Sequence, residues 1–300
     1  MSEYMNKPEL FIEPVTRQYG NHMVMTNVHK SQKTKYVNID TQFRDEYNYQ
    51  QTANYNMTLP ERITDIRTIE VTNIELPMTI YNISANLGNN SFGILNEIIT
   101  IPDGNYNQTS LLTAFNLACT NSTNATTLTI SFSNNITTIT STATSNTTIY
   151  FNVDDSNCGN NNTNLKSKLG WLLGFRKSSY EILLTSNIVS ENMIDLSGPR
   201  YLYLAIDEFN KSNKNTFISP MSSSLINKNI IARISLDMHT HPFGTILPAN
   251  RSNGMLISDT RTYTGKIDLH KINVQLLNEY GNPIILNGMD FAFCLEIVNE

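Results

Sequence analysis

Charge is scarce in this chain. Charged residues make up 16% of its 300 residues, against roughly 25% in an average globular protein. The net charge of −5 argues against a dedicated nucleic-acid binder, because phosphate contacts need clustered Lys and Arg. Two explanations for the scarcity stay open. The surface packs against neighbouring proteins, or an AT-rich genome, whose codons favour Asn and Ile, has shaped the composition.

Cysteine is also scarce. The chain has three, Cys119, Cys158 and Cys294, and none belongs to a C-x-x-C pair. An odd and widely spaced set argues against a disulfide framework and against a structural zinc site. Cys294 lies between Phe293 and Leu295 in an alternating segment, so we expect it to be a small core residue.

Long apolar runs are missing. No segment approaches the roughly 20 apolar residues of a membrane span, and residues 1–10 lack the apolar centre of a secretory signal. We therefore expect a protein made in a reducing cytoplasm. The many N-x-[ST] matches are then expected to carry no glycan, since they arise by chance in a chain this rich in Asn, Ser and Thr.

Motifs of nucleotide binding and nucleophilic catalysis are absent too: the sequence has no P-loop, no G-x-S-x-G and no G-x-G-x-x-G. Asp207 and Glu208 are adjacent in a strand-like segment, so their carboxylates point to opposite faces and do not converge. Asp154-Asp155 lacks the calcium-loop pattern and is interpreted as a solvated turn. We expect no catalytic residue, no cofactor and no enzymatic activity.

A histidine pair needs separate consideration. His239-Thr240-His241 places two imidazoles on the same side if the segment is extended, which is one arrangement for a metal pair. Only Asp237 lies nearby as a further ligand, and Pro242 follows at once. A pair in a turn or at an interface is therefore favoured over a metal site, and we expect no bound metal.

The β-strand patterns are strongest near the end of the chain. Residues 266–298 contain two apolar runs that alternate with a period of two, joined by a Gly281-Asn282-Pro283 turn. A chain that ends on a strand must pair that strand with an earlier one. We expect this pair to complete a sheet that begins near Tyr36.

Other segments predict a mainly β chain with one helical insertion. Residues 1–35 read as an extended arm and residues 208–228 as a long loop. The elements expected between them are a strand at 55–60 ended by Pro60, a strand at 63–76 with a bulge or bend between Ile66 and Ile69, a hairpin at 91–101, a helix at 111–118 capped by Thr109 or Ser110, and an apolar helical turn at 165–175. Residues 97–176 thus form a β-α-β-β-β unit.

Several blocks resemble the penton and minor capsid proteins of large double-stranded DNA viruses of eukaryotes. The most specific are the IDTQFRD…LP…IELP block from residue 39, the LGF element within LGWLLGFR, and the closing LLNEYG…DFAFCLEI. The resemblance covers most of the chain from residue 36 onward. It implies a jelly-roll β-sandwich, which we place at residues 36–300 after the extended arm at 1–35. The unit at about 97–176 is longer than a bare roll needs and is expected to be an inserted lobe or a separate one.

The resemblance also implies a structural role in the virion. We expect a vertex (penton) subunit, a homopentamer that contacts the major capsid protein and other minor capsid proteins, near an internal viral membrane but without a transmembrane segment. Alternatives are a minor capsid or cement protein beneath the shell, or a carbohydrate-binding jelly roll that uses Tyr201 and Tyr203. The candidate interface residues are Lys30, Lys33, Lys35, Tyr201, Tyr203, His239 and His241.

Overall fold

The computed structural model describes residues 32–46, 48, 51–153, 164–209 and 229–299, together with the backbone of residues 18–19 and 22–23. Those two short segments, β1 (Gln18–Tyr19) and β2 (His22–Met23), pair antiparallel. Lys30, Cys158, the Asp154-Asp155 pair and all of residues 210–228 lie outside the described residues.

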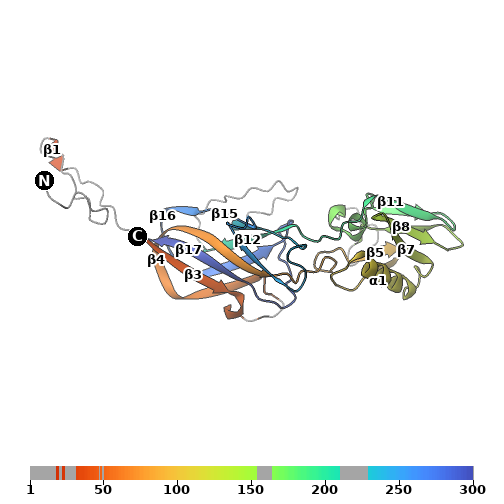
Figure 1. Cartoon of the computed structure of the whole chain (residues 1–300), viewed down its shortest axis with the longest axis horizontal. Helices are drawn as coiled ribbons and strands as arrows, with labels where there is room; N and C mark the ends of the chain where they lie inside the picture. Colours follow the sequence, from red (N-terminus) through yellow and green to blue (C-terminus); the bar gives the residue numbers. More distant parts are fainter. Residues whose placement is uncertain are drawn as a thin grey trace.

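One large antiparallel sheet dominates the body of the molecule (Figure 1). Its strands pair in the order β15-β13-β12-β16-β4-β17-β3, with β14 paired to β4. The bounds are β3 (Lys33–Asp40), β4 (Asn54–Pro77), β12 (Tyr201–Asp207), β13 (Ile230–Ser235), β14 (Ile246–Asn250), β15 (Leu256–Ser258), β16 (Arg261–Leu277) and β17 (Ala292–Asn299).

The sheet folds over itself because β4 belongs to two layers. Residues 54–69 of this 24-residue strand pair with β16, whereas residues 66–75 pair with β17 on the opposite edge and residues 73–77 pair with β14. One layer therefore holds β13, β12, β16 and the first half of β4. The other holds β3, β17, the second half of β4 and β14. Apolar residues from both layers form one core, and the body is a jelly-roll β-sandwich.

The two ends of the described sandwich meet as the alternating pattern predicts. β17 pairs with β3 along its whole length, from Ala292 opposite Asp40 to Asn299 opposite Lys33. Phe293, Leu295 and Ile297 are buried, as expected for a period of two. The expectation that Cys294 is a core residue was wrong: it is only partly buried, because alternation turns it to the opposite face of the strand. The two closing runs are not direct partners, however, since β4 lies between β16 and β17.

The strand expected to end at Pro60 instead continues to Pro77. Pro60 is tolerated because the ladder with β16 is irregular there: Thr58 pairs with Lys271, and the next paired residues are Ile63 and Leu269. The bulge or bend expected between Ile66 and Ile69 is confirmed: Thr68 pairs with Val298 and Ile66 with Asn299, so two residue steps in β4 oppose one in β17. A second bulge lies just before Ile66, where three residue steps in β4 oppose two in β16, and Asp65 has φ of 58° there.

A second hydrophobic cluster lies apart from the sandwich, at the other end of the molecule in Figure 1. Its buried residues run from Ile83 to Ile182, on both sides of the range 97–176. Its elements are β5 (Ser91–Ile94), β6 (Glu97–Thr100), α1 (Gln108–Thr120), β7 (Leu128–Ser133), β8 (Ile136–Ser141), β9 (Thr147–Tyr150), η3 (Leu165–Ser167), α2 (Leu169–Leu172), β10 (Ser179–Ile182) and β11 (Asn187–Met193).

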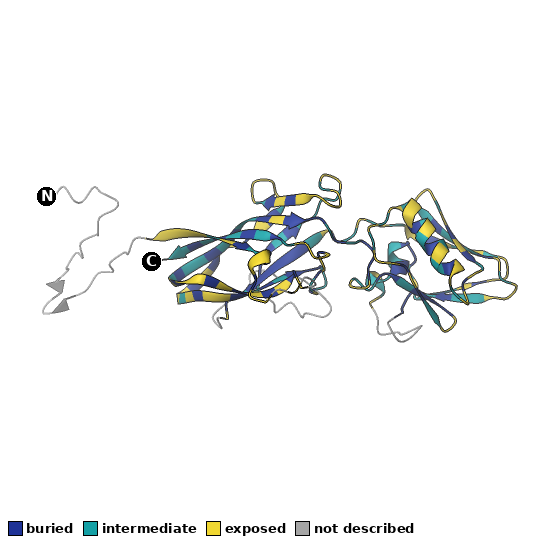
Figure 2. Ribbon diagram, turned by 90° about the horizontal axis from the view of Figure 1, so that it is seen from below, coloured by how far each residue is buried: buried dark blue, intermediate teal, exposed yellow. Residues whose placement is uncertain are grey.

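These elements form two small sheets, and α1 packs its buried face into the same apolar cluster. The strand orders are β10-β9-β5-β6 and β11-β8-β7, and the β5–β6 hairpin confirms the pattern at residues 91–101. Figure 2 shows one exposed and one buried side on α1; Leu111, Phe115 and Cys119 are buried. The helix cap is Asn107, not Thr109 or Ser110, because its side chain accepts from Ser110 N while Ser110 Oγ accepts from Asn107 N.

Candidate assembly surfaces

The lysines predicted as contacts lie at one edge of the sandwich. Lys33 and Lys35 are exposed on β3, and β3 is the last strand of the sheet order; Lys30 lies outside the described residues. Lys35 Nζ is 2.7 Å from Glu61 Oε1 on β4. The hydrogen bond and charge of Lys35 lower the pKa of Glu61. An exposed pair like this stabilises the fold little, but it bridges β3 and β4.

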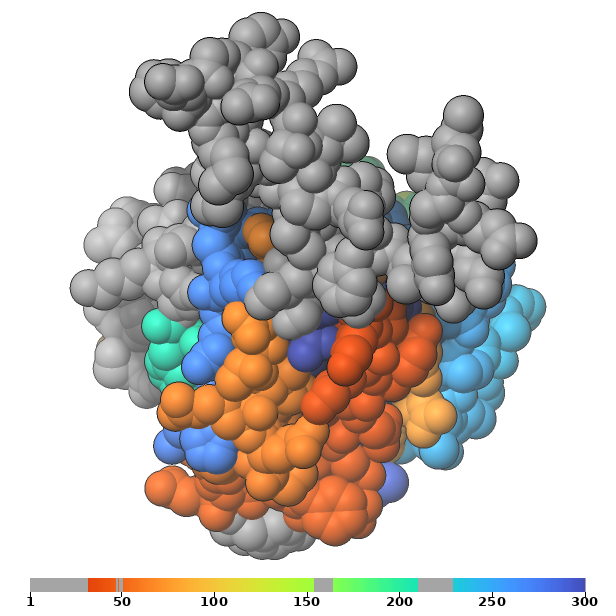
Figure 3. All heavy atoms as spheres, turned by 90° about the vertical axis from the view of Figure 1, so that its left-hand side faces the viewer, coloured from red at the N-terminus to blue at the C-terminus, as the bar shows by residue number. Residues whose placement is uncertain are grey.

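A groove of about 540 Å³ lies between β3 and the first half of β4. It is bounded at one end by the Lys35–Glu61 pair and at the other by the turn after β3, η2 (Thr41–Phe43). Figure 3 shows β4 in orange beside β3 in red on this face. The apolar part of the lining consists of Tyr36, Val37, Phe43, Met57, Leu59 and Ile63. Tyr36 is 67% exposed and Phe43 72%.

Both walls of this groove are strand edges. One edge of β3 pairs with β17, and no described strand pairs with the other. On β4, Asp45 N donates to Asn56 O at 3.1 Å, and Thr58 N donates to Asp45 Oδ1 at 2.8 Å. Pro60 follows and has no N–H to offer. Unpaired edges of this kind bind additional strands unless they are protected. Asp45 covers the β4 edge, whereas on β3 the exposed Lys33 and Lys35 protect only the first residues and leave the uncharged stretch from Tyr36 to Ile39.

The opposite seam of the sandwich, between β14 and β15, is closed more tightly. Ser258 Oγ of β15 accepts from Val71 N of β4 at 3.1 Å, and Arg251 Nη2 donates to Ser258 O at 2.9 Å. Apolar side chains nevertheless face solvent on this flank: Ile246 is 64% exposed and Ile257 is 52% exposed. The two flanks of the sandwich therefore present different apolar surfaces.

The two tyrosines share a face of β12, as their spacing predicts. Their ring centroids are 5.3 Å apart with planes at 67°, and the guanidinium of Arg233 lies 4.3 Å from the Tyr201 centroid. Burial, followed by the neighbouring Tyr203, raises the pKa of Tyr201. Tyr203 is only 7% exposed and packs with Leu277. It cannot offer the open stacking face that a carbohydrate-binding surface requires.

The histidine segment forms a turn after β13, so the extended metal-pair arrangement does not occur. Asp237 Oδ1 accepts from the N–H groups of His239 and Thr240 at 3.0 and 3.2 Å, and Asp237 O accepts from His241 N at 2.9 Å. These bonds fix an Asx turn. The hydrogen bonds from Thr240 lower the pKa of Asp237. Within the described ranges, no group of three or more metal-ligating side chains occurs.

The predicted contact residues do not form one surface. Lys33 and Lys35 lie on β3 at one end of the strand order, whereas Tyr201 and Tyr203 lie on β12, which is next to β13 near the other end. The histidines follow β13 directly. Phe43 and Ile246, which sequence patterns did not single out, are far more exposed than the predicted contact residue Tyr203. Only tertiary structure reveals that exposure.

A buried polar cluster was also missed. Glu208 Oε2 is 2.6 Å from Arg261 Nη1, and Tyr263 OH donates to Glu208 Oε1 at 2.5 Å. Burial and the Glu208 charge raise the pKa of Tyr263. Asp207 instead accepts from Phe209 N at 2.8 Å, so the two adjacent carboxylates do diverge as predicted. The signal for the cluster was the i, i+2 spacing of Arg261 and Tyr263, which places both on one strand face.

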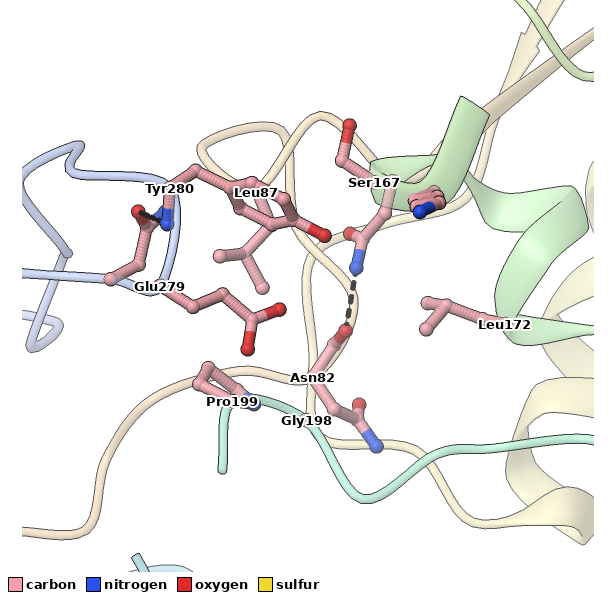
Figure 4. Close-up of a pocket in the computed structure, with 11 residues that line it drawn as sticks. Asn82, Leu87, Ser167, Leu172, Gly198, Pro199, Glu279 and Tyr280 are labelled. Atoms are coloured by element: carbon pink, nitrogen blue, oxygen red, sulfur yellow. Dashed lines mark hydrogen bonds between the residues drawn. The ribbon is translucent and has the colours of Figure 1, made fainter. Parts of the chain in front are cut away.

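A small cavity lies where the second cluster meets the sandwich (Figure 4). Asn82 holds the two connecting segments together: its Nδ2 donates to Tyr106 O and to Leu196 O, both at 2.8 Å. Glu279 and Tyr280 of the sandwich line the same cavity. Its volume of about 70 Å³ is well below the roughly 300 Å³ of a small-molecule pocket. We interpret it as part of a joint and not as a ligand site.

Comparisons with known proteins give structural likenesses. No family model and no curated protein matches the chain. The chain is similar to the mavirus penton protein, with 10% identity and a TM-score of 0.44, over 89% of this chain and 99% of that one. It is also similar to a chain from the cryo-EM structure of the Sputnik virophage, with 12% identity and a TM-score of 0.42, over 89% and 98%. At these values neither likeness transfers a function.

Proposed function

We propose that this chain is a structural subunit of an icosahedral virion shell, a vertex (penton) protein that assembles with itself into a ring of five. The observation that carries the proposal is the pair of different apolar flanks on one sandwich: the β3 flank with Tyr36 and Phe43, and the β14–β15 flank with Ile246 and Ile257. A closed ring needs head-to-tail contacts, in which two different surfaces meet. The sequence blocks that resemble penton and minor capsid proteins support the same role.

The proposal extends to location and partners. The ring would contact the major capsid protein and other minor capsid proteins, and would lie near an internal viral membrane in a particle whose proteins are made in the host cytoplasm. In the described part of the chain, no helix has the length and apolar character needed to cross a membrane. We assign residues 1–35 to an arm and residues 36–300 to the capsid body with its inserted lobe. No catalytic role is proposed.

The mass of the full-length protein in solution tests ring formation. Native mass spectrometry should give a species of five chains that dissociates on dilution. Phe43→Asp and Ile246→Asp place a charge on opposite flanks, at side chains exposed enough to leave the fold intact. Each variant alone should fail to form rings, because one flank of every copy is damaged.

Mixing the two variants distinguishes the contact type. A Phe43→Asp chain keeps its β14–β15 flank, and an Ile246→Asp chain keeps its β3 flank, so head-to-tail contact predicts a dimer of one chain of each kind and nothing larger. Leu183→Asp is the control, since Leu183 is 56% exposed but belongs to the second cluster's surface. A wild-type protein that stays monomeric at every concentration would contradict the proposal, and an Ile246→Asp variant that still forms symmetric dimers would replace it with a two-fold contact.

A minor capsid or cement protein beneath the shell is the second candidate. It would use the same flanks but would not close a five-membered ring. A virion map separates the two roles, because the ring belongs at five-fold positions and the cement protein at general positions under the shell.

A further inference from the structure

We propose that the groove between β3 and β4 binds residues 9–13 of a second copy of this chain as an added strand. This inference rests on the proposed self-assembly and specifies one of its contacts. The groove is open along the edge of β3 with which no described strand pairs, and its floor and rim are apolar through Val37, Met57 and Leu59. An extended peptide that pairs with such an edge gains main-chain hydrogen bonds, while its alternate side chains enter the groove.

The occupant should be a short extended segment with apolar residues. Its side chains must match a groove that offers Leu59 and Ile63 on one wall and Tyr36 on the other. Within the 32 residues before β3, two runs of three apolar residues occur, Leu10-Phe11-Ile12 and Met23-Val24-Met25, and only the first has acidic residues on both sides. These are Glu9 and Glu13. Their charges are opposite to those of Lys33 and Lys35, which are exposed on β3.

A second copy fits better than the same copy. The chain already reverses at Gly20-Asn21, because Tyr19 of β1 pairs with His22 of β2. A continuation of that register would bring residues 9–13 opposite residues 28–32, short of the groove on β3 of the same copy. A segment from a neighbouring copy does not have this restriction.

The length of the linking segment limits this exchange. About 20 residues separate Ile12 from the start of β3, but residues 18–23 fold back on themselves in the β1–β2 hairpin, and the remaining residues span at most about 50 Å at roughly 3.3–3.6 Å per residue. The exchange therefore joins neighbouring copies whose grooves lie within about that distance. The β14–β15 flank can then pack beside the groove without competing for the β3 edge.

Cysteine cross-linking between full-length chains tests the proposal. In a Cys158→Ser, Cys294→Ser background, one variant carries Phe11→Cys and another carries Tyr36→Cys; Tyr36 is 67% exposed, so its replacement leaves the core intact. The two are mixed, oxidised under native conditions and analysed by non-reducing electrophoresis and peptide mass spectrometry. We expect a disulfide between positions 11 and 36 of different chains. A mixture of Phe11→Cys with Leu183→Cys is the matched control and should give no comparable product.

The outcomes separate this inference from the proposed function. Rings of normal mass without the 11–36 disulfide would overturn the groove contact and leave the ring intact. In a Phe11→Cys/Tyr36→Cys double variant, a disulfide formed mainly within one chain at high dilution would show that each copy fills its own groove, which also overturns it. As a second readout, Leu10→Asp should weaken ring assembly at least about tenfold, and Thr16→Asp should not. Equal effects of the two would contradict the assignment of residues 9–13.

Discussion

Arg261 Nη1 lies 2.6 Å from Glu208 Oε2, and the two side chains are only 6% and 1% exposed. Arg261 also donates to Ile206 O at 3.0 Å and, through Nη2, to Asn229 O at 2.9 Å. Glu208 and Asn229 stand on either side of residues 210–228. One guanidinium therefore holds together both chain segments that bracket this stretch, inside a jelly-roll core where a lone charge is costly.

Arg261→Met should lower the free energy of unfolding by about 3–5 kcal/mol, since it leaves Glu208 buried without its partner. Removing both charges, in Arg261→Met/Glu208→Leu, should cost less than the single change. Arg62→Met is the control: its pair with Asp268 spans 3.7 Å between side chains that are 62% and 50% exposed, so its loss should change stability by at most about 1 kcal/mol. Urea unfolding measures all three. Equal losses for Arg62→Met and Arg261→Met would refute the buried clamp.

Gly174 in the LGF element should not accept a side chain. Its φ is +95°, and an added Cβ would lie 2.0 Å from Asn192 O, a backbone atom that cannot move alone. Gly174→Ala should therefore cost about 3 kcal/mol, from backbone strain and overpacking together. Gly254 also has a positive φ, +74°, but open space around it, so Gly254→Ala should cost only about 1 kcal/mol. Thermal unfolding compares the two variants. Similar unfolding midpoints for Gly174→Ala and Gly254→Ala would show that the backbone around Gly174 shifts to accept a side chain.

Cys119 should resist alkylation in the folded protein. Burial raises the pKa of its thiol to about 12, which leaves a thiolate fraction of about 10⁻⁴ at pH 8. Iodoacetamide, followed by mass spectrometry, should label Cys119 only after unfolding in urea, whereas the partly exposed Cys294 should react earlier. Rapid labelling of native Cys119 would indicate that the α1 packing opens readily.

The same thiol makes the free energy of unfolding depend on pH. The unfolded chain releases the Cys119 proton near pH 9, but the folded protein retains it to about pH 12. The contribution to stability is therefore complete below pH 9 and is lost as the pH rises above it. Cys119→Ala, which removes this titration, should make the decline of unfolding free energy between pH 9 and 11 shallower than in the wild type.

Local patterns in the sequence were enough to predict most secondary-structure elements and the pairing of the last strand with the first strand of the sandwich. The alternation of apolar and polar residues predicted that Phe293, Leu295 and Ile297 share one buried face, which the structure confirms. The residues near Tyr36 form β3, the strand that pairs with β17. Leu111 and Phe115 in a helical period predicted α1, although Asn107 and not Thr109 is its cap, because an Asn side chain competes equally well for the free N–H groups of the first turn.

What the sequence determined by itself was a β-rich chain with one helical insertion, two closing strands and few charges, because side-chain periodicity and turn chemistry act over a few residues. Tertiary structure alone decided that β4 lies between β16 and β17, that Arg261 reaches Glu208 across 53 positions, and that β3 and β4 leave a groove. These features arise where distant segments meet as the sheet folds into two layers, and no local pattern encodes which strand edges remain unpaired.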